Sequence, residues 1–178
     1  MYAQDYDEII PKAWFGSTNA PSDAVALYKW MDAVIPYIKN EAVFNCPSTS
    51  TQKYSFRNGT NYGHYRISAA YWGGSPVSGP QNRPLSTMAV PADTVLAADC
   101  LPGGFEFGWQ GIPNNPAIVN SSPRTLSALV ERHSDTCNTL FCDGHVKAFK
   151  LDTLARTNPN PPNPAAAGVM SYFSVEED

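Results

Sequence analysis

The chain has 178 residues, a formal net charge of −4 and 43% hydrophobic residues. This length and composition predict one folded domain, residues 1–178, and exclude a disordered chain. The acidic balance and the scattered Lys and Arg residues argue against nucleic acid and anionic lipid as partners, and no stretch approaches the ~18 apolar residues of a membrane span.

The 16 Pro and 12 Gly residues predict short elements joined by many ordered loops, so the expected fold class is a loop-rich α+β domain. Residues 1–10 are expected to be the end of a helix. An amphipathic helix is predicted from Asp23 to about Ile35, with Pro36 either kinking it, ending it or opening a short second helix. The apolar stripe of this helix consists of Leu27, Trp30, Met31 and Val34.

Several segments in the middle of the chain combine strand-forming residues with flanking turn residues. The expected strands are Glu41 to Asn45, Lys53 to Phe56, Tyr62 to Trp72, Thr94 to Ala98 and Phe105 to Trp109. Ser122-Pro123 resembles a helix start, and residues 126, 129 and 130 fit one helical face, but that segment is short enough to be a strand instead.

Two apolar runs, Cys137 to Cys142 and His145 to Phe149, are separated by Asp143-Gly144. This spacing predicts a β-hairpin with a two-residue type I′ turn, in which Cys142 faces His145. Strand alternation then puts Phe141, Val146 and Ala148 on the core face and His145 on the opposite, exposed face. We expect this hairpin to share an antiparallel sheet with Thr94 to Ala98, covered on one face by the predicted helix.

The C-terminal part contains many prolines. Leu151 to Ala155 is expected to make one helical turn, and Asn158 to Pro164 an extended linker or strap. Ala165 to Val175 is predicted to return as an edge strand. Residues 158–178 therefore form a Pro-rich C-terminal extension of the domain.

The pattern His133, nine residues, Asp143-Gly144 resembles the H-x9-D-G signature of bacterial prepilin- and pseudopilin-like proteins. Other parts of the chain are also similar to that family, in the family's order, from residue 1 to about 155. These are Met1 to Glu8, Pro36 to Asn40, Val43 to Ser48 and Pro91 to Asp99. Each short motif is weak alone, and their order gives the resemblance its weight. The family's cleavage signal and long apolar N-terminal helix are not in the sequence, so residues 1–10 are expected to be where such a helix ends.

The resemblance implies a non-enzymatic structural subunit, the globular domain of a type II secretion pseudopilin or type IV pilin-like protein. Its implied partners are copies of itself or other pilin-like subunits and the secretion or pilus assembly machinery, with membrane contact only through the N-terminal helix. The implied location is exported, periplasmic or at the cell surface. The alternative function is a secreted glycan-binding module that stacks sugars on Trp72, Phe105, Phe107 and Trp109.

The four cysteines are interpreted either as one or two disulfides or as small buried side chains. Cys137 and Cys142 lie five residues apart on opposite faces of one predicted strand, so a bridge between them would require a bulge. Cys100 ends a strand that should neighbour the hairpin, so if a disulfide exists, it is expected to join Cys100 to Cys137 or Cys142. The resemblance implies that Cys46 is unpaired in this chain.

No catalytic or metal-binding motif occurs in the sequence, so the prediction is no catalytic residue, no cofactor and no metal. If a metal bound, the ligands would be Asp99, His133 and Asp143, from a cluster that also includes Asp135 and His145. The resemblance keeps calcium conceivable, although the Asp and Asn residues follow no calcium-loop spacing. Otherwise His133, Asp143 and Gly144 are expected to be structural, with His133 bonding backbone at the hairpin entry.

Overall fold

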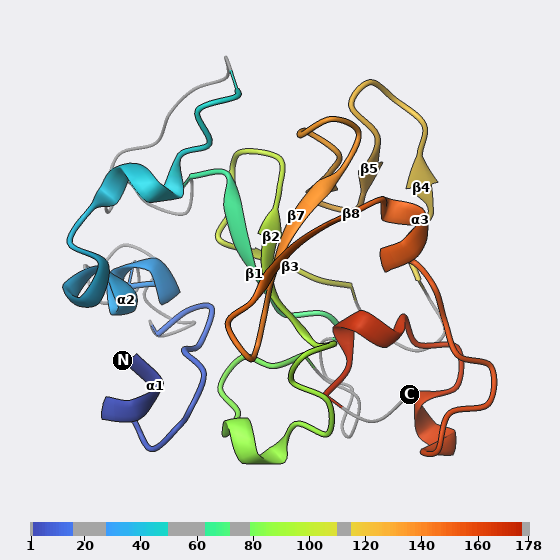
Figure 1. The fold of residues 1–178 in the computed structure, drawn as a ribbon, viewed down its shortest axis with the longest axis horizontal. Coiled ribbons are helices and arrows are strands. Elements are labelled where there is room, and N and C mark those ends of the chain that lie inside the picture. The colour runs from blue at the N-terminus through green and yellow to red at the C-terminus, as the bar shows by residue number, and fades with distance from the viewer. Residues whose placement is uncertain (1, 16–27, 50–62, 72–78, 110–114, 176–178) are drawn as a thin grey trace.

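The computed structural model describes residues 2–15, 28–49, 63–71, 79–109 and 115–175 (Figure 1). It is a mixed α+β fold, which confirms the expected class. The central feature is a five-stranded sheet in the order β3-β1-β2-β7-β8. Its strands are β1 (Tyr65–Ser68), β2 (Val95–Asp99), β3 (Glu106–Phe107), β7 (Cys137–Phe141) and β8 (Val146–Phe149).

Within this sheet β1, β2, β7 and β8 are joined by antiparallel pairing, and only β3 runs parallel to its neighbour β1. The predicted neighbourhood of β2 and the β7–β8 hairpin is therefore confirmed. A second, three-stranded antiparallel sheet contains β4 (Ile118–Val119), β5 (Thr125–Leu126) and β6 (Leu129–Val130). Residues 122–130 are thus a strand pair, and the helix considered for them is wrong.

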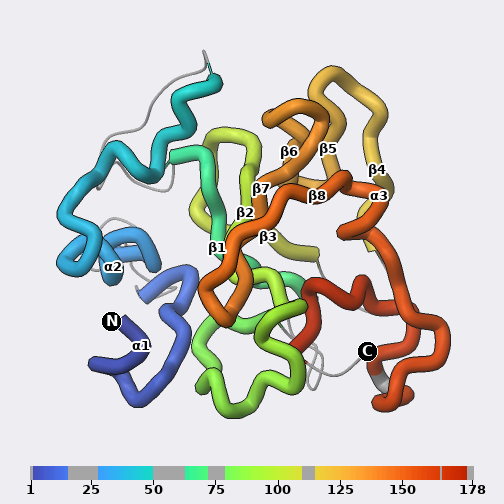
Figure 2. Tube along the Cα trace, viewed as in Figure 1, coloured from blue at the N-terminus to red at the C-terminus, as the bar shows by residue number. Residues whose placement is uncertain are grey.

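The helices are short and lie on both sides of the central sheet. Figure 2 shows the first two on one side, and the last helix with the C-terminal segment on the other. They are α1 (Tyr2–Asp5), α2 (Trp30–Ile38) and α3 (Leu151–Leu154), with 3-10 turns η1 (Glu41–Phe44), η2 (Leu85–Thr87), η3 (Pro164–Ala166) and η4 (Ser171–Phe173). The helical turn expected in residues 151–155 is confirmed as α3, and α1 is one helical turn within residues 1–10.

Helix α2 begins later than predicted. Lys29 has an extended backbone and forms an isolated bridge with Trp14, so the helix begins at Trp30, and residues 23–27 of the prediction lie outside the described residues. Pro36 does not end the helix, which continues to Ile38. Because proline lacks a donor and Pro36 is in the last turn, only one intrahelical hydrogen bond is lost.

Two predicted strands are 3-10 turns. In residues 41–45 the side chain of Asn40 accepts a hydrogen bond from the Ala42 N–H, which starts the turn η1. In residues 165–175 the chain makes η3 and η4, and its β-pairing within the described residues is the isolated bridge between Thr157 and Met170. The predicted strand at 53–56 lies outside the described residues.

The hairpin loop has three residues, not two. Phe141 N–H donates to His145 O at 2.9 Å and Gly144 N–H to Phe141 O at 3.0 Å, and Leu140 is the partner of Val146. Gly144 has φ of 96°, as expected of the left-handed position that ends a three-residue loop. The predicted register is therefore wrong by one residue.

This slip changes which side chains face the core. Phe141 is buried as expected, but Val146 is 66% exposed and Ala148 is exposed. His145 shares the face of Phe141, and the two rings stack with centroids 4.3 Å apart. The reason is the period of two along a strand, which moves every side chain of β8 to the other face when the register shifts by one.

The main core lies between the sheet and the C-terminal segment. Phe107, Trp109 and Phe173 form edge-to-face or tilted ring pairs with centroids 5.0 to 6.3 Å apart, next to the fully buried Leu151 and Leu154. The C-terminal extension is thus part of the core. Its burial explains why a segment without strands is held in place.

Candidate functional site

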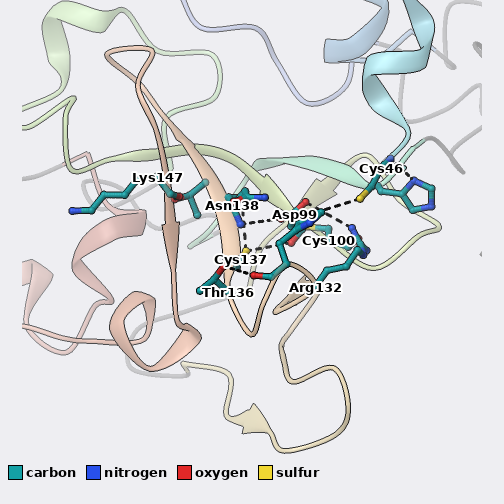
Figure 3. A network of polar contacts seen from close by, with 11 residues as sticks. Cys46, Asp99, Cys100, Arg132, Thr136, Cys137, Asn138 and Lys147 are labelled. Carbon is teal, nitrogen blue, oxygen red and sulfur yellow. Dashed lines mark hydrogen bonds and ion pairs between the residues drawn. The ribbon is translucent and has the colours of Figure 1, made fainter. Parts of the chain in front are cut away.

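Three chemically reactive side chains from distant parts of the sequence meet beside the central sheet. Cys46 follows η1, Asp99 is the last residue of β2, and His133 lies in the connection between β6 and β7. Their Sγ, carboxylate oxygen and ring nitrogen all lie within 4.8 Å of one another. In Figure 3 the side chain of Cys46, in the segment that follows η1, points toward Asp99. We call these residues the Cys-Asp-His cluster.

The cluster converges on one atom of the histidine. His133 Nε2 lies 3.4 Å from Cys46 Sγ and 3.5 Å from Asp99 Oδ2. A nucleophile relay of the Cys-His-Asp type requires the thiol on one ring nitrogen and the carboxylate on the other. Here both contact the same nitrogen, so the arrangement is that of three ligands around a point.

Asp99 is the buried centre of the cluster. Its Oδ2 accepts a hydrogen bond from the Asn138 N–H at 2.9 Å, and its Oδ1 lies 3.7 Å from Arg132 Nη1. Burial raises the pKa of Asp99, while the Asn138 hydrogen bond and the positive charges of His133 and Arg132 act in the opposite direction. Oδ1 is buried and accepts no hydrogen bond from the residues that the structure describes.

Cys46 is held through its backbone and is fully buried. Its N–H donates to His64 Nδ1 at 3.0 Å, which orients the residue toward the sheet. Tyr65 lies beside it, and burial first, followed by the neighbouring Cys46 and Asp99 side chains, raises the pKa of Tyr65 to about 12. Tyr65 therefore stays a neutral phenol next to the cluster at physiological pH.

His133 is placed by a tight turn. Its N–H donates to Thr136 O at 3.1 Å, and its carbonyl accepts from the Thr136 N–H at 3.0 Å. Between them Ser134 and Asp135 have φ of 51° and 57°, which are the two positive values of a type I′ turn. These contacts involve only the backbone of His133, and its side chain, which was expected to bond nearby backbone, instead faces Cys46 and Asp99.

The structure separates the predicted site residues into two groups. Asp99 and His133 come together, whereas Asp143 lies at the tip of the hairpin, where its Oδ1 is 2.7 Å from His145 Nδ1. Asp135 belongs to the type I′ turn. Cys46 was not among the predicted ligands, because the residues around it carry no motif that connects it to residues 53 and 87 positions away.

All four cysteines are buried free thiols. The bridge expected from Cys100 to Cys137 or Cys142 is therefore not formed. Cys137 Sγ instead donates to the Asp99 carbonyl at 3.5 Å, and Cys142 is in the hairpin loop. Burial raises the pKa of Cys100 and of Cys142 to about 12, so both are unreactive as thiols.

A second feature is an apolar hollow of about 260 Å³ between α2, η1 and the sheet. Helix α2 borders this hollow, and beside it Trp30 packs against the buried cluster that contains Ile67 of β1. Three of its lining residues are unusually exposed for apolar side chains: Ile38 (42%), Val43 (43%) and Val146 (66%). The other lining residues are Trp30, Phe44, Tyr65, Ala97, Ala98, Asn138, Thr139 and Leu140.

Three of the four aromatic side chains of the alternative function lie in the described residues, and they do not form an exposed platform. Phe107 and Trp109 are buried in the main core, and Phe105 is partly buried against a smaller one. These three side chains are therefore occupied in packing, whereas Trp72 lies outside the described residues.

No family model, curated protein or solved structure matches the chain. Among the described residues, no helix combines the length and the apolar character needed to cross a bilayer.

Proposed function

We propose that this chain is the globular domain of a structural subunit in a pilin- or pseudopilin-like assembly, exported and displayed outside the inner membrane. Its role is to pack against neighbouring subunits, and it performs no chemistry. Its partners are copies of itself or related subunits, together with the machinery that assembles them. The proposal rests on the sequence resemblance from residue 1 to about 155 and is supported by three structural observations.

The observation that carries the proposal is the position of the signature residues. His133 opens the tight turn that precedes β7, and Asp143-Gly144 form the loop that follows it. The nine intervening residues are the strand with its flanking turn residues. The H-x9-D-G pattern in this chain therefore specifies one sheet strand and both of its ends, which is what a folding signature of a structural subunit requires.

The second observation is the position of α1. This short helix at the start of the chain contacts α2, and Tyr37 Oη donates to Asp5 Oδ2 at 2.7 Å. The chain therefore begins beside α2. In the proposed assembly α1 is the last turn of a longer helix, and these contacts would hold that turn against α2.

The third observation is the exposed apolar rim of the hollow. Ile38, Val43 and Val146 leave apolar surface in water, which becomes favourable when a neighbouring subunit covers it. We assign this face to contact with a second copy of the domain. The net charge of −4 is small enough that electrostatic repulsion does not prevent two copies from packing.

Cross-linking in the cells that naturally produce the protein tests this proposal. Because the native cysteines are all buried, Val146→Cys introduces an exposed thiol at the rim of the hollow. Val119→Cys is the matched control, since Val119 is 57% exposed on the separate three-stranded sheet. A bifunctional maleimide should give a covalent dimer with Val146→Cys, because each subunit then offers one accessible thiol, and only monomer with Val119→Cys. Monomer with both variants would contradict the proposed packing face.

A further inference from the structure

We propose that the Cys-Asp-His cluster is a zinc site, with Cys46 Sγ, Asp99 Oδ2 and His133 Nε2 as its three protein ligands. This inference goes beyond the structural role proposed above and does not depend on it. It rests on the convergence, spacing, chemistry and burial of the three side chains.

The spacing is that of a tetrahedral metal site. Zinc lies about 2.3 Å from a thiolate sulfur and about 2.0 to 2.1 Å from an imidazole nitrogen or a carboxylate oxygen. Tetrahedral angles then place sulfur about 3.6 Å from nitrogen and nitrogen about 3.4 Å from oxygen. The observed separations are 3.4 Å for Cys46 Sγ to His133 Nε2 and 3.5 Å for His133 Nε2 to Asp99 Oδ2. The third pair, Cys46 Sγ and the Asp99 carboxylate, lies within 4.8 Å, against about 3.6 Å around a tetrahedral zinc ion, so the ion fits if these two ligands close on it.

The donor set selects the kind of metal. One sulfur, one nitrogen and one oxygen around a tetrahedron favour zinc over calcium or magnesium, which take oxygen ligands. Zinc binding replaces the Cys46 S–H bond with a Zn–S bond, and the proton is released to solvent. His133 binds through neutral Nε2, with its proton on Nδ1. Three protein ligands leave a fourth position, and because the His133 side chain is 27% exposed, water can reach it.

The surroundings support a cation at this point. Asp99 is a fully buried acidic side chain, and its two oxygens are divided between different neighbours. Oδ1 faces the Arg132 guanidinium, which is anchored by a hydrogen bond from Nη2 to the Cys100 carbonyl at 2.5 Å. Oδ2, held by the Asn138 N–H, faces the cluster. This outer set of contacts orients one carboxylate oxygen for a single metal bond.

A metal bound here would link three segments that lie far apart in the sequence. Cys46 belongs to the segment after η1, Asp99 to the sheet and His133 to the turn before β7. A metal that binds only the folded state stabilises that state by an amount that grows with the logarithm of the ratio of metal concentration to Kd. Zinc should therefore raise the melting temperature, and a chelator should lower it.

The test uses the full chain, purified without metal and titrated with zinc and with cobalt. The expected result is one metal ion bound per chain. The cobalt form should show a thiolate-to-cobalt charge-transfer absorption and the intense visible bands of tetrahedral cobalt. His133→Ala should weaken metal binding at least about a hundredfold, since loss of an outer partner alone costs 10- to 100-fold. Cys46→Ser should remove the thiolate-to-cobalt absorption.

The matched control is His145→Ala. His145 is also a histidine beside a carboxylate, with Nδ1 2.7 Å from Asp143 Oδ1, but it is exposed and outside the cluster. Its substitution should leave stoichiometry and affinity unchanged. The inference is overturned if the wild-type chain binds neither metal, if His133→Ala binds as well as wild type, or if His145→Ala abolishes binding. If Cys46→Ser does not fold, the wild-type cobalt spectrum and the two histidine variants decide the question.

Discussion

Tyr71→Phe should destabilise the protein by removing one hydroxyl that ties the C-terminal segment to the core. Tyr71 is fully buried, and its Oη donates to Asn115 Oδ1 at 2.6 Å and accepts from the Met170 N–H at 2.6 Å. Asn115 in turn donates to the Gly168 carbonyl at 2.7 Å. The hydroxyl thus connects three segments that no regular strand pairing joins.

The magnitude follows from these contacts. A net hydrogen bond contributes about 0.5 to 1.5 kcal/mol, and a buried donor left without its partner costs about 1 to 3 kcal/mol. Met170 is buried whereas Asn115 is only partly so, which lets water replace the second contact more easily than the first. We expect a loss of about 2 to 4 kcal/mol, which corresponds to a fall of about 5 to 15 °C in Tm for a chain of this size.

Thermal and urea unfolding, followed by near-ultraviolet circular dichroism, measure this loss. Tyr172→Phe is the matched control, because Tyr172 packs its ring near Phe141 and Phe149 and its hydroxyl makes no hydrogen bond within the described part of the chain. It should change stability by less than about 0.5 kcal/mol. The reasoning is refuted if Tyr71→Phe is as stable as wild type or if both variants lose the same amount.

Three further predictions concern the turns, the thiols and a surface ion pair. Gly144→Val should lower the free energy of unfolding by only about 1 to 2 kcal/mol in urea, because Gly144 has φ of 96° but no atom lies near the added Cβ. Gly63→Ala should lower it more, because its Cβ would also collide with the Phe44 carbonyl. Cys142, whose pKa burial raises to about 12, should react with a thiol reagent only after unfolding, and fast reaction of the folded chain at neutral pH would contradict its burial. Hydrogen bonds from Arg124 lower the pKa of Asp152 in the folded protein below its pKa in the unfolded chain, which is about 4. The stability that Asp152 contributes is therefore present above the unfolded-state pKa and is lost as pH falls through the folded-state pKa. Asp152→Asn should therefore flatten the stability profile below about pH 4, and an unchanged profile would exclude the ion pair as a contributor.

The sequence located the β7–β8 hairpin but not its register, and the structure gives the physical reason. Asp143-Gly144 does form the turn, yet Cys142 N–H donates to the Thr94 carbonyl at 3.0 Å and Asp143 N–H to the Pro91 carbonyl at 3.3 Å. These contacts with the turn before β2 draw Cys142 into the loop. A tertiary contact of this kind leaves no trace in the local pattern, so the two-residue turn was the better local prediction.

The type I′ turn occurs instead at Ser134-Asp135, a pair that lacks the glycine usual for this turn. It is stabilised by the paired backbone hydrogen bonds of His133 and Thr136, together with the Thr136 hydroxyl, which donates to the His133 carbonyl at 2.5 Å. Local chemistry could have suggested a turn there, but not its type.

The candidate site was only partly predictable for a similar reason. Asp99 could be placed at the end of a strand and His133 at the entry to the hairpin, and the antiparallel pairing of β2 with β7 brings those two positions together. Cys46 reaches them from a 3-10 turn in a segment predicted to be a strand. Its position depends on how that segment folds back on the sheet, which neither periodicity nor spacing encodes.

The most direct test of the proposed function is to find where the protein is and in what form. Surface material sheared from the cells that produce it naturally should be separated from the soluble fraction and labelled with an antibody against this domain for electron microscopy. The account predicts that the antibody decorates filaments or short pseudopilus fibres in the sheared or envelope material. Recovery of the protein only as a monodisperse, unassembled species, with no labelled fibres, would contradict it.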